Sequence, residues 1–180
     1  MAVETYAIVA YLHGPLAEFV DGLRKELDPT HAGKAAHLTL LPPRPLSISE
    51  EEALEQARAY CADWEPFPIE IGGVATFLPP GVVYVELAEG SEQMGRLHSE
   101  LNRGCLAGEE AWSYVPHITI AQDLDGPQTR ELAAHVSERL AAYRGPRRLL
   151  VDKLTFVRQS PAGDWIDLAD VQLGQAPVLV

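Results

Sequence analysis

The sequence predicts an α+β fold of two similar lobes, with helices on their outer faces and a cleft between them, in one domain that spans residues 1–180. Three observations support this prediction. Strand-like and helix-like segments alternate along the whole chain. The second half repeats the element order of the first at an offset of 79 or 80 residues. Each half also contains a His-x-Thr motif in a strand-like context, at residues 37–40 and 117–120.

The first half opens with a β-branched and aromatic run at 6–12, which indicates a strand. Apolar residues at helical spacing follow from 15 to 27, and Asp28-Pro29 ends that helix. A strand at 36–41 stops at Pro42-Pro43, and an acidic first turn then begins a helix at 49–64. Strands at 67–77 and 82–88 are joined by a proline-glycine turn at 79–81.

The second half is expected to follow the same plan. Helices are predicted at 91–104 and 126–143, the second with Pro127 near its start. Strands are predicted at 115–121, 147–159 and 164–173. Laid over the first half, His37 meets His117, the helix from Ser49 meets the helix from Gln128, and Tyr6 falls near Tyr84. We interpret this agreement as an internal duplication.

Composition indicates an ordinary globular chain. Of its residues, 47% are hydrophobic and 22% are charged, as expected for a protein that buries a core of its own. No apolar run approaches the roughly 20 residues of a membrane span, and the N-terminus lacks the basic segment of a signal peptide. Cys61 and Cys105 are expected to be free thiols. We therefore expect a cytoplasmic protein without a membrane partner.

Charge limits the nucleic acids that the chain can bind. The net charge is −12, from 26 acidic and 14 basic side chains. Such a surface repels phosphates at long range, and no run of lysines and arginines offsets it. Extended duplex nucleic acid is thus excluded as an expected partner. A small nucleotide or an RNA end, held in a locally basic cleft, remains compatible with this charge; the oligomeric state is left open.

The two motifs carry the chemistry. Side chains alternate faces along a strand, so His37 shares one face with Thr39, and His117 shares one with Thr119. Two lobes related by a pseudo-twofold axis would direct these four side chains into one cleft. Opening a cyclic phosphodiester needs a base for the attacking water and an acid for the departing oxygen, and histidine can do either near neutral pH. Threonine hydroxyls can donate to the phosphate oxygens.

Together with Pro116 and the stretch LTFVRQSPAGDW at 154–165, these motifs resemble the 2H phosphoesterase superfamily, which includes 2′-5′ RNA ligase-like proteins and cyclic phosphodiesterases. The resemblance covers nearly the whole chain and implies antiparallel sheets around a central cleft. It implies metal-independent hydrolysis of 2′,3′-cyclic phosphates or 2′-5′ phosphodiesters, with ligation as the reverse reaction. It carries the catalytic roles onto His37, Thr39, His117 and Thr119.

Two arginines are weaker candidates for binding the substrate. Arg44 follows the first motif strand and could fold over the cleft to hold phosphate, or could equally be a surface arginine. The resemblance suggests a basic cleft residue near Arg158, whereas strict alternation puts Arg158 on the face opposite to Thr155. Metal ligands usually cluster, as in His-x-His, and no such spacing occurs, so we expect no metal and no other cofactor.

Alternatives remain at this point. A strand histidine is often a partly buried, hydrogen-bonded side chain without a catalytic role. A module that binds a nucleotide or an RNA 3′ end without turnover would carry the same four residues, and a structural scaffold would have no affinity for phosphate. Pseudo-symmetry also leaves open which histidine acts as base and which as acid.

Overall fold

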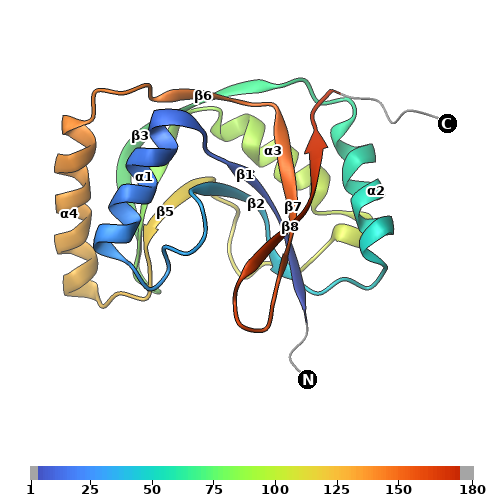
Figure 1. Cartoon of the computed structure of the whole chain (residues 1–180), viewed down its shortest axis with the longest axis horizontal. Coiled ribbons are helices and arrows are strands. Elements are labelled where there is room, and N and C mark those ends of the chain that lie inside the picture. The colour runs from blue at the N-terminus through green and yellow to red at the C-terminus, as the bar shows by residue number, and fades with distance from the viewer. Residues whose placement is uncertain (1–3, 175–180) are drawn as a thin grey trace.

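The structure is a computed structural model that describes residues 4–174 as two four-stranded sheets with helices packed on them (Figure 1). In chain order the elements are β1 (Thr5–Tyr11), α1 (Gly14–Leu27), β2 (His37–Arg44), α2 (Glu50–Cys61), β3 (Phe67–Phe77), β4 (Val82–Glu89), α3 (Ser91–Leu101), the 3-10 turn η1 (Gly104–Leu106), β5 (His117–Ala121), α4 (Gly126–Ala142), β6 (Arg148–Val151), β7 (Lys153–Gln159) and β8 (Trp165–Gln172). The expected α+β architecture with two antiparallel sheets is confirmed.

The two sheets have matching strand orders. One sheet is ordered β2-β1-β7-β8 and the other β5-β4-β3-β6, and every pairing is antiparallel. The motif strands β2 and β5 therefore occupy the same place in the two sheets, each at one edge. These two edges lie side by side at the centre of the molecule (Figure 1).

One predicted strand is divided between the sheets. The prediction of a continuous strand at 147–159 is wrong, because β6 pairs with β3 in one sheet and β7 pairs with β1 in the other. Asp152 lies between them, and its carbonyl accepts a hydrogen bond of 2.9 Å from the Leu173 amide. Strand propensity is high on both sides of Asp152, so the local sequence does not reveal that the chain changes sheets there.

Each lobe combines elements from both halves of the chain. Helices α2 and α3 pack on the sheet that contains β2, whereas α1 and α4 pack on the sheet that contains β5 (Figure 1). Thus α1 follows a strand of one sheet and covers the other, and α3 does the reverse. The strands β3 and β7, which hold equivalent places in the two sheets, also lie in the sheet opposite to the first two strands of their own half. The duplication is visible in the strand order, but a half of the sequence is not a lobe.

Strand pairing corrects the residue-level match between the halves. Val9 pairs with Thr39, and Tyr84 pairs with Thr119, so Tyr84 corresponds to Val9 and not to Tyr6. The chain from Tyr84 to Thr119 spans 35 residues and that from Val9 to Thr39 spans 30, so the offset between the halves is 75 residues at these partners and 80 at the motif strands.

The equivalent helices α2 and α4 begin with the same device. Ser49 and Glu52 form a capping box at the start of α2, and Asp125 and Gln128 form one at the start of α4. Each box satisfies amide groups that the first helical turn leaves free. Helices α1 and α4 then pack together through stacked Phe19 and Tyr143 rings, with centroids 4.4 Å apart. Between residues 4 and 174, no helix is both long and apolar enough to cross a bilayer.

Candidate active site

The motif side chains alternate between the core and the opposite face of each strand, as the strand pattern predicts. The four apolar members are at most 1% exposed: Leu38, Leu40, Ile118 and Ile120. The four polar members are half-buried on the other face: His37, Thr39, His117 and Thr119. Burial of the apolar residues fixes the register of β2 and β5, because a shift of one residue would exchange the two sets.

Both imidazoles are held in the same way. The Nδ1 atom of His37 donates to the carbonyl oxygen of Ala35, and Nδ1 of His117 donates to that of Val115, each over 2.7 Å. A carbonyl oxygen can only accept, so the neutral rings carry their proton on Nδ1 and keep the Nε2 lone pair free. Each histidine therefore presents Nε2 as the atom that can take up or release a proton.

Burial keeps the imidazoles neutral in the resting protein. Burial, the largest cause, and the charges of Arg24, Lys34 and His117 together lower the pKa of His37 to about 4, although the hydrogen bond to the Ala35 carbonyl opposes them. Burial also lowers the pKa of His117. The effect of His117 on His37 agrees with the side-by-side placement of β2 and β5.

The His117 half of the site is aromatic. The Phe77 and Tyr84 rings are stacked, with centroids 4.2 Å apart. Both make T-shaped contacts with the His117 ring, at centroid distances of 5.1 and 5.2 Å. Tyr84 lies opposite Thr119 in the strand pair. The ring of His117 is thus fixed by its bond to Val115 and by two aromatic neighbours.

The His37 half is built differently. Trp165, from the start of β8, lies 4.7 Å from the His37 ring. The Trp165 ring packs on three small side chains, which leave room for it beside His37: Ala7, Val9 and Val157. Lys34 places its ammonium 4.6 Å from the centre of the Trp165 ring. The two histidines thus share a backbone arrangement but have different surroundings.

Sequence reasoning did not identify Trp165, Lys34, Phe77 and Tyr84 as residues of the site. Only Tyr84 left a usable signal, since strand alternation puts it on the same face of β4 as Glu86, opposite to Val83 and Val85. Trp165 stands far from His37 in both sequence and strand order. Its contact depends on the twist of the sheet, which brings distant corners together.

The predicted substrate ligand Arg44 is placed in a polar network behind β2. Its guanidinium donates to Glu110 over 2.6 Å, to Asn102 over 2.5 Å and to the Leu106 carbonyl over 3.1 Å. The other carboxylate oxygen of Glu110 is 3.2 Å from Nε2 of His98.

This network also holds the outer edge of the first motif strand. Nδ1 of His98 donates to the Leu40 carbonyl over 2.7 Å, and the Tyr114 hydroxyl donates to the Thr39 carbonyl over 2.9 Å. The His98 and Tyr114 rings are stacked at 4.0 Å. Leu40 is the extra residue of a β-bulge, so its carbonyl would otherwise lack a partner in the β1–β2 ladder.

Arg158, the second predicted ligand, pairs with Glu50 of α2 over 2.9 Å. It therefore lies on the helix-covered face of its sheet, as strict alternation predicts, while Thr155 and Val157 lie on the other face. Roles for Arg44 and Arg158 in substrate binding stay predictions, and both side chains already have carboxylate partners.

A further connection joins the two motif segments. Asp28, at the end of α1, accepts a hydrogen bond of 3.1 Å from the Gln122 amide just after β5. His31 lies between Asp28 and Asp123, at 2.9 and 3.2 Å. The loop before β2 is thereby attached to the end of β5, which limits movement of one motif relative to the other.

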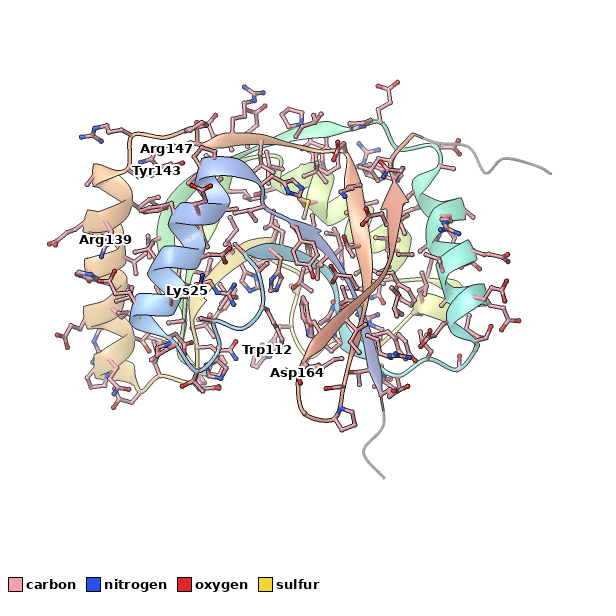
Figure 2. All side chains as sticks on the ribbon, viewed as in Figure 1. Lys25, Trp112, Arg139, Tyr143, Arg147 and Asp164 are labelled. Atoms are coloured by element: carbon pink, nitrogen blue, oxygen red, sulfur yellow. The ribbon has the colours of Figure 1, made fainter. Side chains whose placement is uncertain are left out.

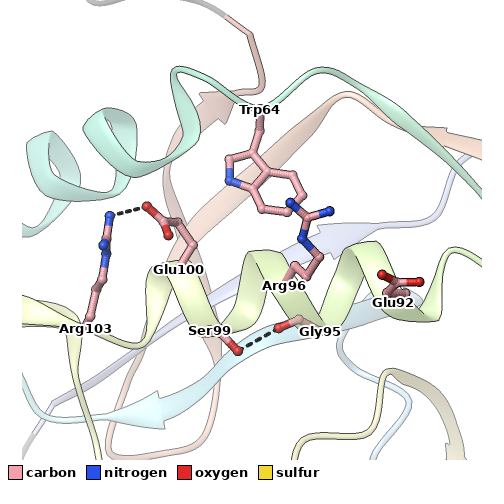
Figure 3. Close-up of a pocket in the computed structure, with 7 residues that line it drawn as sticks. All are labelled: Trp64, Glu92, Gly95, Arg96, Ser99, Glu100 and Arg103. Atoms are coloured by element: carbon pink, nitrogen blue, oxygen red, sulfur yellow. Dashed lines mark hydrogen bonds and ion pairs between the residues drawn. The ribbon is translucent and has the colours of Figure 1, made fainter.

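The hollow drawn in Figure 3 lies elsewhere, on the outer side of α3. Trp64, Arg96, Glu100 and Arg103 are among the residues that line it. Arg96 stacks over Trp64 at 5.7 Å, and Arg103 pairs with Glu100. None of the four motif side chains lines this hollow.

Solved structures share this fold. Escherichia coli LigT, crystallised with 3′-AMP, superimposes with a TM-score of 0.65 at 18% identity, over 97% of this chain and 100% of that one. The TT0787 protein of Thermus thermophilus gives a TM-score of 0.63 at 21% identity, over 95% and 98%. At such identity these likenesses establish the architecture alone.

Sequence relatives agree. A protein of Oceanobacillus iheyensis whose name assigns it provisionally to the phosphoesterases is 34% identical over 67% of this chain and 71% of its own. A Bacillus licheniformis protein with the same provisional name is 26% identical over 89% and 93%. The family model described as the 2′-5′ RNA ligase superfamily matches residues 12–162. The chain therefore belongs to the 2′-5′ RNA ligase superfamily, the 2H phosphoesterases, and is an enzyme of the phosphoesterase or RNA ligase type.

Proposed function

We propose that this protein hydrolyses 2′,3′-cyclic phosphates, or the related 2′-5′ phosphodiesters, of nucleotides or RNA ends by acid-base catalysis with two histidines. The observation that carries the proposal is the matched geometry of His37 and His117. Both lie on equivalent edge strands, both have Nδ1 fixed by a carbonyl two residues earlier, and both leave Nε2 free. The 3′-AMP in the LigT crystal is the kind of 3′-phosphorylated nucleoside that such a reaction releases.

His37 is assigned the role of base. Its pKa of about 4 leaves the ring neutral at physiological pH, with the Nε2 lone pair available for a proton from water. His117 is assigned the role of acid. Its pKa is also lowered by burial, but a bound phosphate anion favours the imidazolium and raises the pKa again in the complex.

In the proposed hydrolysis each histidine transfers one proton. The water oxygen bonds to phosphorus while its proton passes to Nε2 of His37. The bond from phosphorus to one ribose oxygen breaks, and that oxygen takes the proton from Nε2 of His117. Thr39 and Thr119 donate hydrogen bonds to the non-bridging oxygens, where negative charge builds up. Exchange with solvent returns a proton to His117 and removes one from His37.

Hydrolysis by this route needs no metal ion. Across residues 4–174 the structure contains no group of three histidine, cysteine or acidic side chains suited to holding one. The substrate enters as a small nucleotide or an RNA end, because the surface charge of −12 disfavours long duplexes. We further propose a cytoplasmic location, where such RNA ends are produced.

The test is incubation with the four nucleoside 2′,3′-cyclic phosphates in excess EDTA, followed by chromatography of the products. We expect a nucleoside monophosphate with the wild-type protein and almost none with His37→Ala or His117→Ala. Binding without product would support a recognition module and refute the proposed hydrolysis. Activity that disappears in EDTA and returns with a divalent ion would refute the two-histidine mechanism.

A further inference from the structure

Lys34 stands out among the cations near the candidate active site. It lies in the loop between α1 and β2, three residues before His37, and its ammonium packs over the Trp165 ring. Of the other two lysines in the chain, Lys153 pairs with Asp170 over 2.7 Å and Lys25 is exposed on α1 (Figure 2). Lys34 alone combines partial burial with a position beside a motif histidine.

The backbone of Lys34 is held in place. Arg24, whose side chain is only 7% exposed, donates to the Lys34 carbonyl over 2.6 Å and to the His31 carbonyl over 3.0 Å. Asp21 accepts a hydrogen bond of 2.8 Å from the Ala36 amide. The loop is thus attached to α1 at three points, so little order has to be gained when a ligand arrives.

Donors next to His37 lack acceptors. Within the described chain the Lys34 ammonium makes no ion pair and no hydrogen bond, although it can donate three. Burial lowers the pKa of Lys34, the charge of Arg24 adds to this effect, and Asp164 opposes it from beyond ion-pair distance. The Trp165 indole N–H is likewise buried without an acceptor in residues 4–174. Buried donors without partners are rare, but this indole N–H is closed to solvent. The Lys34 ammonium is only partly buried and is the donor that a ligand can reach.

The two halves of the site differ in charge. Lys34 and Arg24 act on His37, whereas the neighbours of His117 are the Phe77 and Tyr84 rings and, across the strand pair, Glu86. An anionic substituent of the substrate is thus attracted to the His37 side and repelled from the other. Asp164 and Asp21 offset part of this positive charge, but the charges that act on His37 itself are positive. In a chain of net charge −12, this gives the pseudo-symmetric site a direction.

We propose that Lys34, seated over Trp165, binds a second phosphate group of the substrate, next to the one that is cleaved. The Lys34 ammonium contacts the Trp165 ring, and the Trp165 ring in turn contacts His37. We therefore assign to Lys34 a phosphate next to the scissile group, and not the scissile group itself. The preferred substrate is then an RNA end, whose terminal nucleoside carries a 5′-phosphate, and not a nucleoside cyclic phosphate. This assignment rests on the proposed function and specifies its substrate.

The kinetic test compares two substrates that differ by one adenosine and one phosphate. They are adenosine 2′,3′-cyclic phosphate and the dinucleotide ApA ending in a 2′,3′-cyclic phosphate. Lys34→Gln is expected to lower kcat/KM for the dinucleotide on the order of tenfold more than for the mononucleotide, mainly through KM. Lys34→Arg should retain most of the preference. Lys25→Gln removes the same charge from the exposed face of α1 and should leave the ratio unchanged. An equal loss on both substrates, or no loss, overturns the assignment.

A binding experiment separates this assignment from the proposed function. The Kd of the 3′-phosphorylated dinucleotide ApAp is measured calorimetrically between 50 and 200 mM salt, since the loss of one phosphate contact reduces the slope of log Kd against log salt concentration. We expect that reduction in Lys34→Gln and none in Lys25→Gln. If the wild type hydrolyses neither cyclic substrate, the proposed function fails, while the slope still decides the role of Lys34. An unchanged slope in Lys34→Gln overturns that role.

Discussion

Replacing Arg44 tests whether this arginine supports the first motif strand or binds substrate. Its side chain is 10% exposed and that of Glu110 is 17% exposed, so the pair is nearly buried. Arg44→Met removes the donors to Glu110, Asn102 and the Leu106 carbonyl, and it leaves a nearly buried carboxylate with Nε2 of His98 as its remaining partner. Breaking one side of such a pair costs about 3–5 kcal/mol.

The assay is equilibrium urea unfolding, followed by tryptophan fluorescence and by circular dichroism. In thermal unfolding of a chain of this size, the same loss of 3–5 kcal/mol in the free energy of unfolding would lower Tm by about 6–20 °C. Arg148→Met is the matched control, because Arg148 pairs with Glu89 while their side chains are 56% and 44% exposed. Exposed pairs contribute about 0–1 kcal/mol, so this control should unfold almost like the wild type.

A double-mutant cycle adds a second criterion. Arg44→Met and Glu110→Met together should cost less than the two single changes added, because the double mutant leaves no unpaired charge between these positions. The reasoning is refuted if Arg44→Met matches the wild type in stability within about 0.5 kcal/mol. If such a stable variant also showed a raised KM, Arg44 would bind the substrate, as the sequence alone suggested.

Three further expectations concern activity. His37→Ala and His117→Ala should each lower kcat about 10²–10⁴-fold with an unchanged circular dichroism spectrum, and the double variant should be little worse; full activity in either variant would contradict the mechanism. The pH profile of kcat/KM should be a bell whose basic limb falls below the ordinary histidine value of 6.5, because burial lowers the pKa of both rings: activity is lost above the pKa of His117, which must be protonated, and below that of His37, which must be neutral. A basic limb above pH 8 would refute the assignment of His117 as the acid. Lys34→Gln should move the acidic limb to higher pH, since it removes a positive charge that lowers the pKa of His37. Finally, short substrates should be turned over faster than long RNA at low salt, where repulsion from the acidic surface is least screened; the reverse order in a salt titration would show that charge does not control access.

The network behind β2 supports the first motif strand. The carbonyls of Thr39 and Leu40 are held by Tyr114 and His98, which also stack on each other. Because β2 is an edge strand, these bonds replace the ladder that a neighbouring strand would provide. Support of this kind keeps a catalytic side chain within the narrow range of positions that proton transfer requires.

The division of each motif into buried apolar residues and polar residues on the other face could be predicted from the local pattern. Alternation alone separated His37 and Thr39 from buried Leu38 and Leu40, because a strand has a side-chain period of two and one face had to enter the core. Neighbouring residues also predicted two helix starts, from the acidic first turn of α2 and from Pro127 near the start of α4. Element order and the repeat at about 80 residues then predicted two equivalent sheets.

Tertiary packing decided the rest. The sheet change at Asp152, the exchange of α1 and α3 between lobes and the partners of Arg44 all depend on which distant surfaces meet. The contact of Trp165 with His37 depends on sheet twist and on a floor of small side chains contributed by two other strands. Periodicity and capping are properties of neighbouring residues, so a sequence displays them directly. Pairing between remote segments is selected by the free energy of the whole fold, and for this reason only the structure revealed that the two motif histidines have unlike surroundings.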